Sequence, residues 1–300
     1  MGDLLQQVPE TFYSYQPLWY QYFNPRRRAD ANKFIIDLFR CKVFDEMYVK
    51  NHLKRLARRG YHGRKDDNNW LISSCFGPDC YKPERMTQFC DNSRVHLMKE
   101  LELGMEKLEE MVKKFNGPGF KVVFYIRDPR GVYNSRHKLK IVEHNLPSAN
   151  EQEICVKMSK DWNEFTNLQK KYPGTFTLLR YEDLALNPMH TAERLFDTLA
   201  LDFDDEIRRW IREATNATNS WQDVNPEQSH EDNFDQLRIL NYQTKRDSIK
   251  VPMQWAKFLP WEMVNKIQSF CGTLMNEIGY KLVSNEEELK SLMDPYQFYI

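Results

Sequence analysis

The segment from Val122 to Ile126 constrains the fold most, because it is a short run of β-branched and aromatic residues, Val-Val-Phe-Tyr-Ile. A run of this kind, without polar alternation, predicts a buried strand of the type that parallel sheets contain. Asp128-Pro129 follows closely and supplies a helix N-cap residue and a proline at the first helical position. The sequence therefore predicts a strand that leads directly into the N-terminus of a helix.

Two arginines, Arg127 and Arg130, lie at this predicted junction. A helix N-terminus presents unpaired N–H groups and the positive end of the helix dipole, which together suit a phosphate. Arginine adds a permanent positive charge and forked hydrogen-bond donors. The alternative is an ordinary strand-to-helix turn whose arginines are solvated, and these residues alone leave both interpretations open.

Length and charge narrow the class of protein. Three hundred residues with 41% hydrophobic content suffice for one large globular domain or two small ones. Lys+Arg and Asp+Glu both number 43, so the net charge is zero and a nucleic-acid binder is disfavoured. An anionic nucleotide would have to be held by local charge. No run approaches eighteen apolar residues and no signal segment opens the sequence, so no membrane span is expected.

The six cysteines leave two interpretations open. They are Cys41, Cys75, Cys80, Cys90, Cys155 and Cys271. None forms a C-x-x-C pair of the zinc-binding type. They are either scattered buried thiols of a cytosolic enzyme or disulfides formed in an oxidising lumen. A glycosylation sequon at Asn216-Ala-Thr218 agrees weakly with the lumen.

Periodicity and turn residues predict the other elements. Helical spacing of apolar residues predicts helices over 29–39, 44–58, 101–115, 151–171, 189–200, 206–214 and 261–278. A capping box from Ser148 to Glu151 is expected to open the longest helix, and Gly279 to close the last one. Short strands are expected at 11–15, 95–98 and 175–179. A polar, cysteine-bearing insert is expected over about 60–91.

Two segments carry a resemblance to a known family. Arg127-Asp-Pro-Arg-Gly-Val-Tyr-Asn-Ser135 resembles the 3'-phosphate-binding segment of carbohydrate sulfotransferases, in particular the Golgi family that sulfates the 6-hydroxyl of GlcNAc, Gal or GalNAc. Arg180-Tyr-Glu-Asp-Leu-Ala-Leu-Asn-Pro188 resembles a second signature of sulfotransferases, whose Glu182 and Asp183 we expect to cap a helix as scaffold. The resemblance runs from about Leu4 to Lys290. It implies one α/β domain over 1–300, with a P-loop-like, three-layer fold and a mostly parallel central sheet flanked by helices.

The resemblance implies an enzyme, a transferase that moves a sulfuryl group from PAPS (3'-phosphoadenylyl sulfate) to a sugar hydroxyl. The 6-hydroxyl of a glycan or glycosaminoglycan is the expected acceptor, and no metal is expected. In the family an arginine and a serine hold the 3'-phosphate, and these correspond to Arg127 and Ser135. Asp128, Pro129 and Arg130 complete the expected donor-binding segment.

The spacing of these two residues raises a geometric question. If the helix begins at Pro129, Ser135 lies about 9 Å along it. A phosphate that touches both Arg127 and Ser135 would then require either a later helix start or the long reach of the arginine. The resemblance also makes Lys245 and Arg246 candidates for a position near the nucleotide, against the alternative of solvated loop charges.

Two departures from the family are visible. The family's loop for the 5'-phosphosulfate, of the type Arg-(Ser/Thr)-Gly-Ser-Ser-Phe, should immediately precede Leu4, and we expect this chain to be a fragment or to begin at an alternative start. Gln16 occupies the position of the family's candidate general base, and a glutamine amide takes up no proton at useful pH. The catalytic base is therefore unknown. The alternative function is a sulfotransferase remnant that binds nucleotide or glycan without turnover.

A nucleotide kinase is a further hypothesis, since it would share the sheet and the phosphate-loop architecture. The sequence contains no Gly-x-x-x-x-Gly-Lys-Ser/Thr segment, which argues against it.

The family also implies a compartment, partners and disulfides. Its members are Golgi-lumen glycoproteins of type II topology, so a membrane contact is expected only through an N-terminal anchor that this chain lacks. A glycan acceptor is the expected partner, and no nucleic acid. The resemblance predicts a Cys155–Cys271 disulfide, together with a local disulfide among Cys75, Cys80 and Cys90, with Cys41 as a fourth partner.

Overall fold

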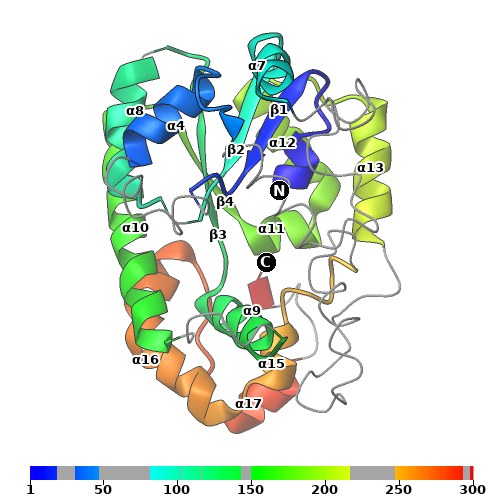
Figure 1. The fold of residues 1–300 in the computed structure, drawn as a ribbon. Helices are drawn as coiled ribbons and strands as arrows, with labels where there is room; N and C mark the ends of the chain where they lie inside the picture. The colour runs from blue at the N-terminus through cyan, green and yellow to red at the C-terminus, as the bar shows by residue number, and fades with distance from the viewer. Residues whose placement is uncertain are drawn as a thin grey trace. The chain divides into compact units, whose positions relative to one another are not determined.

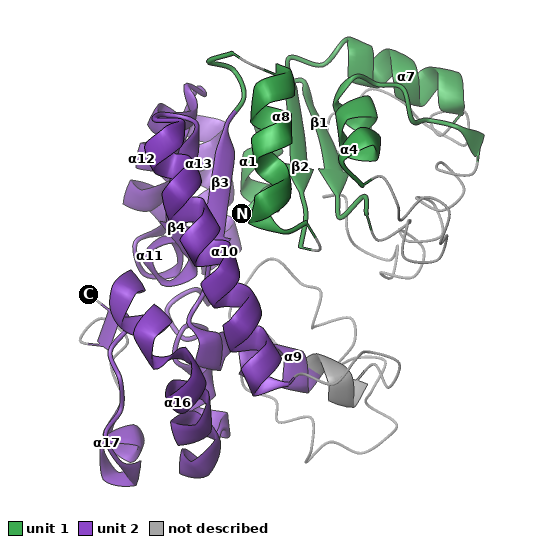
Figure 2. Ribbon diagram, turned by 90° about the vertical axis from the view of Figure 1, so that its left-hand side faces the viewer, with its two compact units in different colours: residues 1–120 green, residues 121–300 purple. Residues whose placement is uncertain are grey.

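The computed structural model describes residues 1–18, 31–46, 82–101, 103–115, 117–142, 150–216, 247–292 and 298–299. The chain divides into two compact units, residues 1–120 and 121–300, which are coloured separately in Figure 2. Their grouping into one domain over 1–300 stays a prediction. Several sequence expectations lie outside the described residues: the helix over 47–58, the cysteines at 75 and 80, Lys245 and Arg246, and the end of the glycosylation sequon.

The first unit is built on a parallel pair of strands (Figure 1). Strand β1 (Thr11–Tyr15) pairs with β2 (Val95–Lys99), with Thr11 opposite Val95 and Tyr15 opposite Lys99. The first four residues of β1 are buried. The helices of this unit are α1 (Gly2–Leu5), α4 (Ala31–Phe39), α7 (Pro83–Asp91), the 3-10 helix η2 (Met105–Lys107) and α8 (Leu108–Phe115). Because β1 and β2 are parallel, their carboxyl ends lie at the same edge of the pair.

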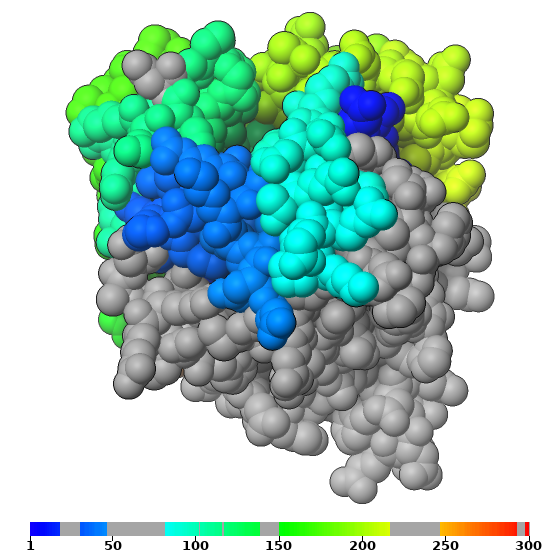
Figure 3. Space-filling view, turned by 45° about the horizontal axis from the view of Figure 1, so that its top comes forward, coloured from blue at the N-terminus to red at the C-terminus, as the bar shows by residue number. Residues whose placement is uncertain are grey.

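One disulfide joins separate segments of this unit. Cys41 bonds to Cys90, and both lie in a small core with Phe12, Leu38 and Met86. Residues 31–46 and 82–101 accordingly lie side by side on one face (Figure 3). The pairing agrees with the expectation that Cys41 joins the cysteines of the insert.

The expected polar insert over 60–91 needs a correction at its end. Residues 83–91 are not a loop but helix α7, which begins with Pro83 at its first turn. Proline is well suited to that position because its missing N–H would have no partner there. The sequence interpretation treated Pro83 only as a turn residue.

The second unit contains the other parallel pair. Strand β3 (Val122–Ile126) pairs with β4 (Phe176–Arg180), with Val122 opposite Phe176 and Ile126 opposite Arg180. The described helices are α9 (Pro129–Val142), α10 (Glu151–Lys171), α11 (Tyr181–Leu186), α12 (Pro188–Leu199), α13 (Asp205–Thr215), α15 (Gln254–Phe258), α16 (Trp261–Ile278) and α17 (Glu286–Ser291). All described strands thus pair in parallel, which confirms the α/β prediction.

The burial of β3 differs from the expectation. Only Ile126 is buried, and the preceding four residues are half-buried. The apolar composition predicted a fully covered strand. In the described part of this unit β3 has β4 as its one strand partner, so its other edge lacks a neighbour there.

The core of the second unit lies around α16. This helix packs along α10, and the Cys155–Cys271 disulfide joins the two, as predicted. Gly279 ends α16 in the left-handed conformation with φ 86°, also as predicted. The start of α10 needs a correction, because the cap is Asn150, whose side chain accepts from the N–H groups of Gln152 and Glu153. Both Asn and Ser are good cap residues, and position alone decides between them here.

Within the described residues, no helix is both long and apolar enough to cross a bilayer.

Candidate functional site

The junction between β3 and α9 is formed as the sequence predicts. Helix α9 begins at Pro129, and the Asp128 Oδ1 accepts a hydrogen bond from the Arg130 N–H at 2.9 Å. This is the N-cap contact that Asp-Pro at a helix start indicates. The turn therefore has the geometry in which a helix N-terminus follows a parallel strand directly.

Arg130 faces the interior of the second unit. Its Nε donates to Asp128 Oδ1 at 2.9 Å, and its terminal nitrogens donate to Asp128 Oδ2 at 2.6 Å and to Gln268 Oε1 at 2.9 Å. The guanidinium also lies 4.0 Å from the centre of the Trp255 ring. Asp128 and Arg130 are both 0% exposed. They form a buried pair that holds the turn in shape, so we assign them to its support and not to direct contact with a ligand.

Glu182 supports the same turn from the end of β4. Its Oε1 accepts the Asp128 N–H at 3.0 Å, and its Oε2 accepts the Tyr280 hydroxyl at 2.7 Å. Burial, and next the charge of Asp128, raise the pKa of Glu182 to about 7. The expectation that Glu182 and Asp183 cap a helix is wrong, because α11 has no side-chain cap and Asp183 instead pairs with Arg180 Nε at 2.9 Å. The carboxylates found stronger partners in a neighbouring N–H and a guanidinium.

Tyr299 reaches the turn from far along the chain. Its hydroxyl donates to Asp128 Oδ2 at 3.0 Å and accepts the Trp255 Nε1–H at 2.8 Å. Burial, and next the negative charge of Asp128, raise the pKa of Tyr299, so the hydroxyl stays protonated. The residue thus ties the Asp128 carboxylate to the core around α15.

Arg127 is arranged differently from Arg130. Its guanidinium lies 4.3 Å from the centre of the Tyr181 ring and over Gly131 in the first turn of α9. Its Nε is buried and has no hydrogen-bond partner in the part of the chain that the structure describes. Burial opposes the charge, but Tyr181 and Glu182 outweigh it, so the pKa of Arg127 is raised. A buried, charged donor without a partner is unfavourable unless a ligand supplies the acceptor.

Ser135 lies on the helix face that Arg127 covers. It follows Gly131 by four residues, which places the two on the same side of α9, about 6 Å apart along the axis. Since the helix does begin at Pro129, the later start considered above is excluded. The long reach of Arg127 over Gly131 is the arrangement left, and a phosphate with hydrogen bonds of about 2.8 Å to each side fits such a gap.

Lys138 lies one turn beyond Ser135 on the same face of α9. Its side chain is buried, and its ammonium lies 3.6 Å from the centre of the Phe258 ring. This cation–π contact keeps a positive charge at the far end of the face. The face therefore carries, in order, the Arg127 guanidinium, the Ser135 hydroxyl and the Lys138 ammonium, all of which suit an anion.

Gln16 follows directly after β1 in the first unit. Its N–H donates to the Lys99 carbonyl at 2.6 Å, which extends the β1–β2 ladder by one bond. Its φ is 45°, in the left-handed region that non-glycine residues adopt rarely. The backbone turns sharply here, at the carboxyl edge of the parallel pair. The amide itself offers no site for a proton.

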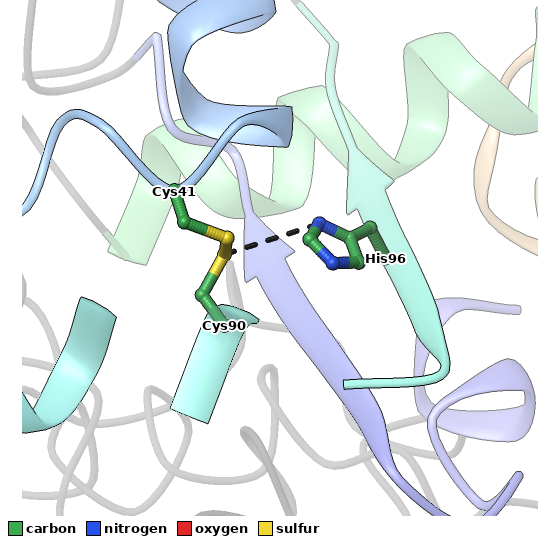
Figure 4. A group of neighbouring side chains, drawn as sticks. All are labelled: Cys41, Cys90 and His96. Atoms are coloured by element: carbon green, nitrogen blue, oxygen red, sulfur yellow. Dashed lines mark hydrogen bonds between the residues drawn. A yellow bond between two sulfur atoms is a disulfide. The ribbon is translucent and has the colours of Figure 1, made fainter. Parts of the chain in front are cut away.

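A further cluster in the first unit brings together potential metal ligands. The ligand atoms of Cys41, Cys90 and His96 lie within 4.8 Å of one another, and a Cys90 sulfur to His96 Nδ1 contact of 3.9 Å is drawn in Figure 4. Both sulfurs belong to the Cys41–Cys90 disulfide. A thiolate is the form that binds metals, so this cluster does not have the donor set of a zinc site.

Sequence reasoning missed three residues around Arg127 and Asp128. Tyr181 and Tyr299 contact them from 54 and 171 residues away, with no local signal. Gly131 did leave a signal, because a glycine inside a helix costs about 1 kcal/mol relative to alanine and points to a close approach.

The matching family model and relatives agree on the class of protein. The model described as "Sulfotransferase family" matches residues 81–205, which include β2, β3, α9 and β4. "Carbohydrate sulfotransferase 1" of Danio rerio is 24% identical over 342 residues, covering 97% of this chain and 77% of that protein. "Carbohydrate sulfotransferase 4" of Mus musculus is 22% identical, with 97% and 81% covered.

A solved structure also matches. It is the "Sulfotransferase Domain from the Curacin Biosynthetic Pathway", at 15% identity and a TM-score of 0.42, with 77% of this chain and 78% of that chain covered. At this TM-score the match supports no conclusion about the site.

Proposed function

Because this chain belongs to the sulfotransferase family and is related to carbohydrate sulfotransferases over almost its whole length, we propose that it transfers a sulfuryl group from PAPS to a sugar hydroxyl. The proposed acceptor position is the 6-hydroxyl of a residue in a glycan or glycosaminoglycan. When bound, PAPS supplies the activated sulfuryl group. The chemistry is an in-line displacement in which positioning and charge stabilisation provide most of the acceleration.

The observation that supports the donor assignment is the unpaired Nε of Arg127. Arg127 donates to the 3'-phosphate in this proposal, and Ser135 donates from the next turn of the same helix face. Pro129 starts that helix, so the first N–H groups of α9 face outward without competing partners. Asp128 and Arg130 hold the turn through their mutual hydrogen bonds. No residue of this group needs a metal ion for its role.

The disulfides support the proposed compartment. Cys41–Cys90 and Cys155–Cys271 each join separate elements. Disulfides of this kind persist in oxidising compartments and are rare in the cytosol. We propose a Golgi-lumen location, where a glycan acceptor is also available.

A sulfate-transfer assay tests the function. The protein is incubated with PAPS and oligosaccharides ending in GlcNAc, Gal or GalNAc, and sulfated sugar and 3',5'-ADP are measured by mass spectrometry. The matched 6-deoxy sugars serve as controls for position. Equimolar product and 3',5'-ADP from the normal sugars, but not from the 6-deoxy sugars, are the expected result. Product from both would move the acceptor position, and neither product nor nucleotide binding would contradict the proposal.

Gln16 favours a second candidate, a nucleotide- or glycan-binding protein without turnover. In that case 3',5'-ADP binds and calorimetry gives a measurable affinity, but no sulfated sugar forms with any acceptor. Measuring binding and transfer on the same preparation separates the two functions.

A further inference from the structure

We infer that Glu100 is the general base that deprotonates the acceptor hydroxyl, in place of the glutamate that Gln16 lacks. The inference rests on the proposed function and deepens it. Its starting point is a pair of strand ends. Tyr15 ends β1 and Lys99 ends β2, and the two residues are opposite each other in the parallel register. The next residues along the two strands are Gln16 and Glu100, so an amide and a carboxylate leave the same edge.

Ligands of open α/β sheets bind beyond the carboxyl ends of the strands. An acid at this edge therefore lies where an acceptor is expected. Gln16 occupies the edge with an amide, which neither gains nor loses a proton at useful pH. Glu100 supplies the carboxylate that this position requires for general base catalysis.

Hydrogen bonds hold Glu100 against the segment that follows Gln16. Its Oε2 accepts the Leu18 N–H at 2.9 Å, and its Oε1 accepts the Leu101 N–H at 2.8 Å. A carboxylate has about four acceptor positions, so each oxygen keeps capacity for a further hydrogen bond. The two N–H groups fix the rotamer of the side chain, which is a requirement for a base that must meet a hydroxyl in one orientation.

The backbone at Gln16 supports the same assignment. Its left-handed φ of 45° turns the chain so that Leu18 reaches Glu100. A strained residue that the surrounding contacts maintain is typical of functional sites. Glu100 is half-buried, so it is shielded by protein yet retains access to solvent for release of the proton.

The step balances as follows. The Glu100 carboxylate takes the proton of the acceptor hydroxyl while the acceptor oxygen forms a bond to the sulfur of the sulfuryl group. The bond between that sulfur and the oxygen of the 5'-phosphate breaks, and its electron pair leaves with 3',5'-ADP. The protonated Glu100 then releases its proton to water.

Glu100→Gln tests the inference, with Glu84→Gln on the exposed surface of α7 as the matched control. We expect Glu100→Gln to lower kcat at least about 100-fold, which is the lower range for a general base. The dissociation constant of 3',5'-ADP and the midpoint of thermal unfolding should stay within error of the unaltered protein. Glu84→Gln should change none of these quantities.

The double variant Gln16→Glu/Glu100→Gln separates a base from a structural contact. It returns a carboxylate to the edge without the hydrogen bonds of Glu100, so kcat should recover by at least about tenfold, a tenth or more of a general base's contribution. A kcat unchanged in Glu100→Gln, or a loss that Gln16→Glu does not recover, would overturn the inference. If the unaltered protein transfers sulfate in that experiment, the proposed function stands and only the base assignment fails. If it transfers none, both fail.

Discussion

The side chain of Arg127 occupies the space that a β-carbon on Gly131 would need. An ideal β-carbon at Gly131 would lie 2.9 Å from Arg127 Nε and 3.4 Å from its Cζ. Only a glycine in this turn of α9 allows the guanidinium to lie over the helix and extend toward Ser135. The glycine therefore determines where the positive charge of the proposed donor site lies.

We predict that Gly131→Ala weakens 3',5'-ADP binding while the fold is retained. Alanine favours a helix by up to about 1 kcal/mol over glycine, so unfolding should occur at the same or a higher temperature. The displaced guanidinium should lose most of a charged hydrogen bond, worth about 1.5–3 kcal/mol, or roughly tenfold or more in affinity. Calorimetric titration and thermal unfolding of the same sample measure the two effects.

Gly272→Ala is the control for this substitution. Gly272 lies within α16, where an added β-carbon would meet only the Leu282 Cδ1, at 4.0 Å. It should gain stability without any change in affinity. If both glycine variants bind 3',5'-ADP like the unaltered protein, the guanidinium does not act from its position over Gly131.

Arg127 itself should contribute directly to donor affinity. We predict that Arg127→Ala raises the dissociation constant of 3',5'-ADP by about 10–100-fold, since one charged hydrogen bond to phosphate is worth about 1.5–3 kcal/mol. Because the Nε has no partner in the described residues, removal of the side chain leaves no protein acceptor unsatisfied there. Stability should therefore fall little.

Arg212→Ala on the exposed surface of α13 removes the same charge at another place in the second unit. It should leave the dissociation constant within about twofold, because an exposed charge is largely screened. An equal loss of affinity in both variants would indicate a general charge effect and count against a phosphate contact at Arg127.

The local part of the site was predictable from the sequence, and the reason is short range. A strand, an N-cap and a proline are encoded in eight consecutive residues, 122–129, so the junction followed from the chain alone. The parallel pairing followed from the same apolar run. The role of Arg130 did not, since nothing local distinguishes it from Arg127. Only the packing of Trp255 and Gln268 against it shows that one arginine is internal.

The long-range contacts could not be predicted because they follow from packing and have no periodicity. Glu182 bonds to the Asp128 N–H across 54 residues, and Tyr299 to the Asp128 carboxylate across 171. Buried polar groups must find partners, but many choices satisfy that rule. The Cys155–Cys271 pair was predictable only with the resemblance, since six cysteines allow 15 connectivities.

Loss of the Cys155–Cys271 disulfide should destabilise the second unit. The bond closes 116 residues of chain, so the double variant Cys155→Ala/Cys271→Ala should lose about 3–5 kcal/mol in urea unfolding. The corresponding Cys41→Ala/Cys90→Ala variant closes only 49 residues, and its loss should be smaller by somewhat less than about 1 kcal/mol.

Peptide mapping without reductant provides the direct check on both bonds. Linked peptides containing Cys155 with Cys271, and Cys41 with Cys90, should be recovered. Recovery of both cysteines of either pair as free thiols would show that the bond is absent and that the corresponding loss of stability has another cause.

Glu182 should make stability depend on pH in the direction opposite to that of most carboxylates. Burial raises its pKa to about 7 in the folded protein, from an ordinary value of 4.5. The folded state thus holds the proton more tightly than the unfolded state. The stabilisation is fully present below about pH 4.5 and is lost as the pH rises through about 7. A shift of this size corresponds to about 3 kcal/mol.

Glu182→Gln removes this dependence while it keeps the geometry. The amide oxygen can still accept the Asp128 N–H, and the amide nitrogen can donate to the Tyr280 oxygen. We therefore predict that the unaltered protein loses stability relative to Glu182→Gln between pH 5 and pH 8, by up to about 3 kcal/mol. Urea unfolding at one-unit intervals measures the difference directly. A difference that stays constant, or that grows in favour of the unaltered protein as the pH rises, would mean that Glu182 is ionised throughout and that the charges of Arg127 and Arg130 outweigh its burial.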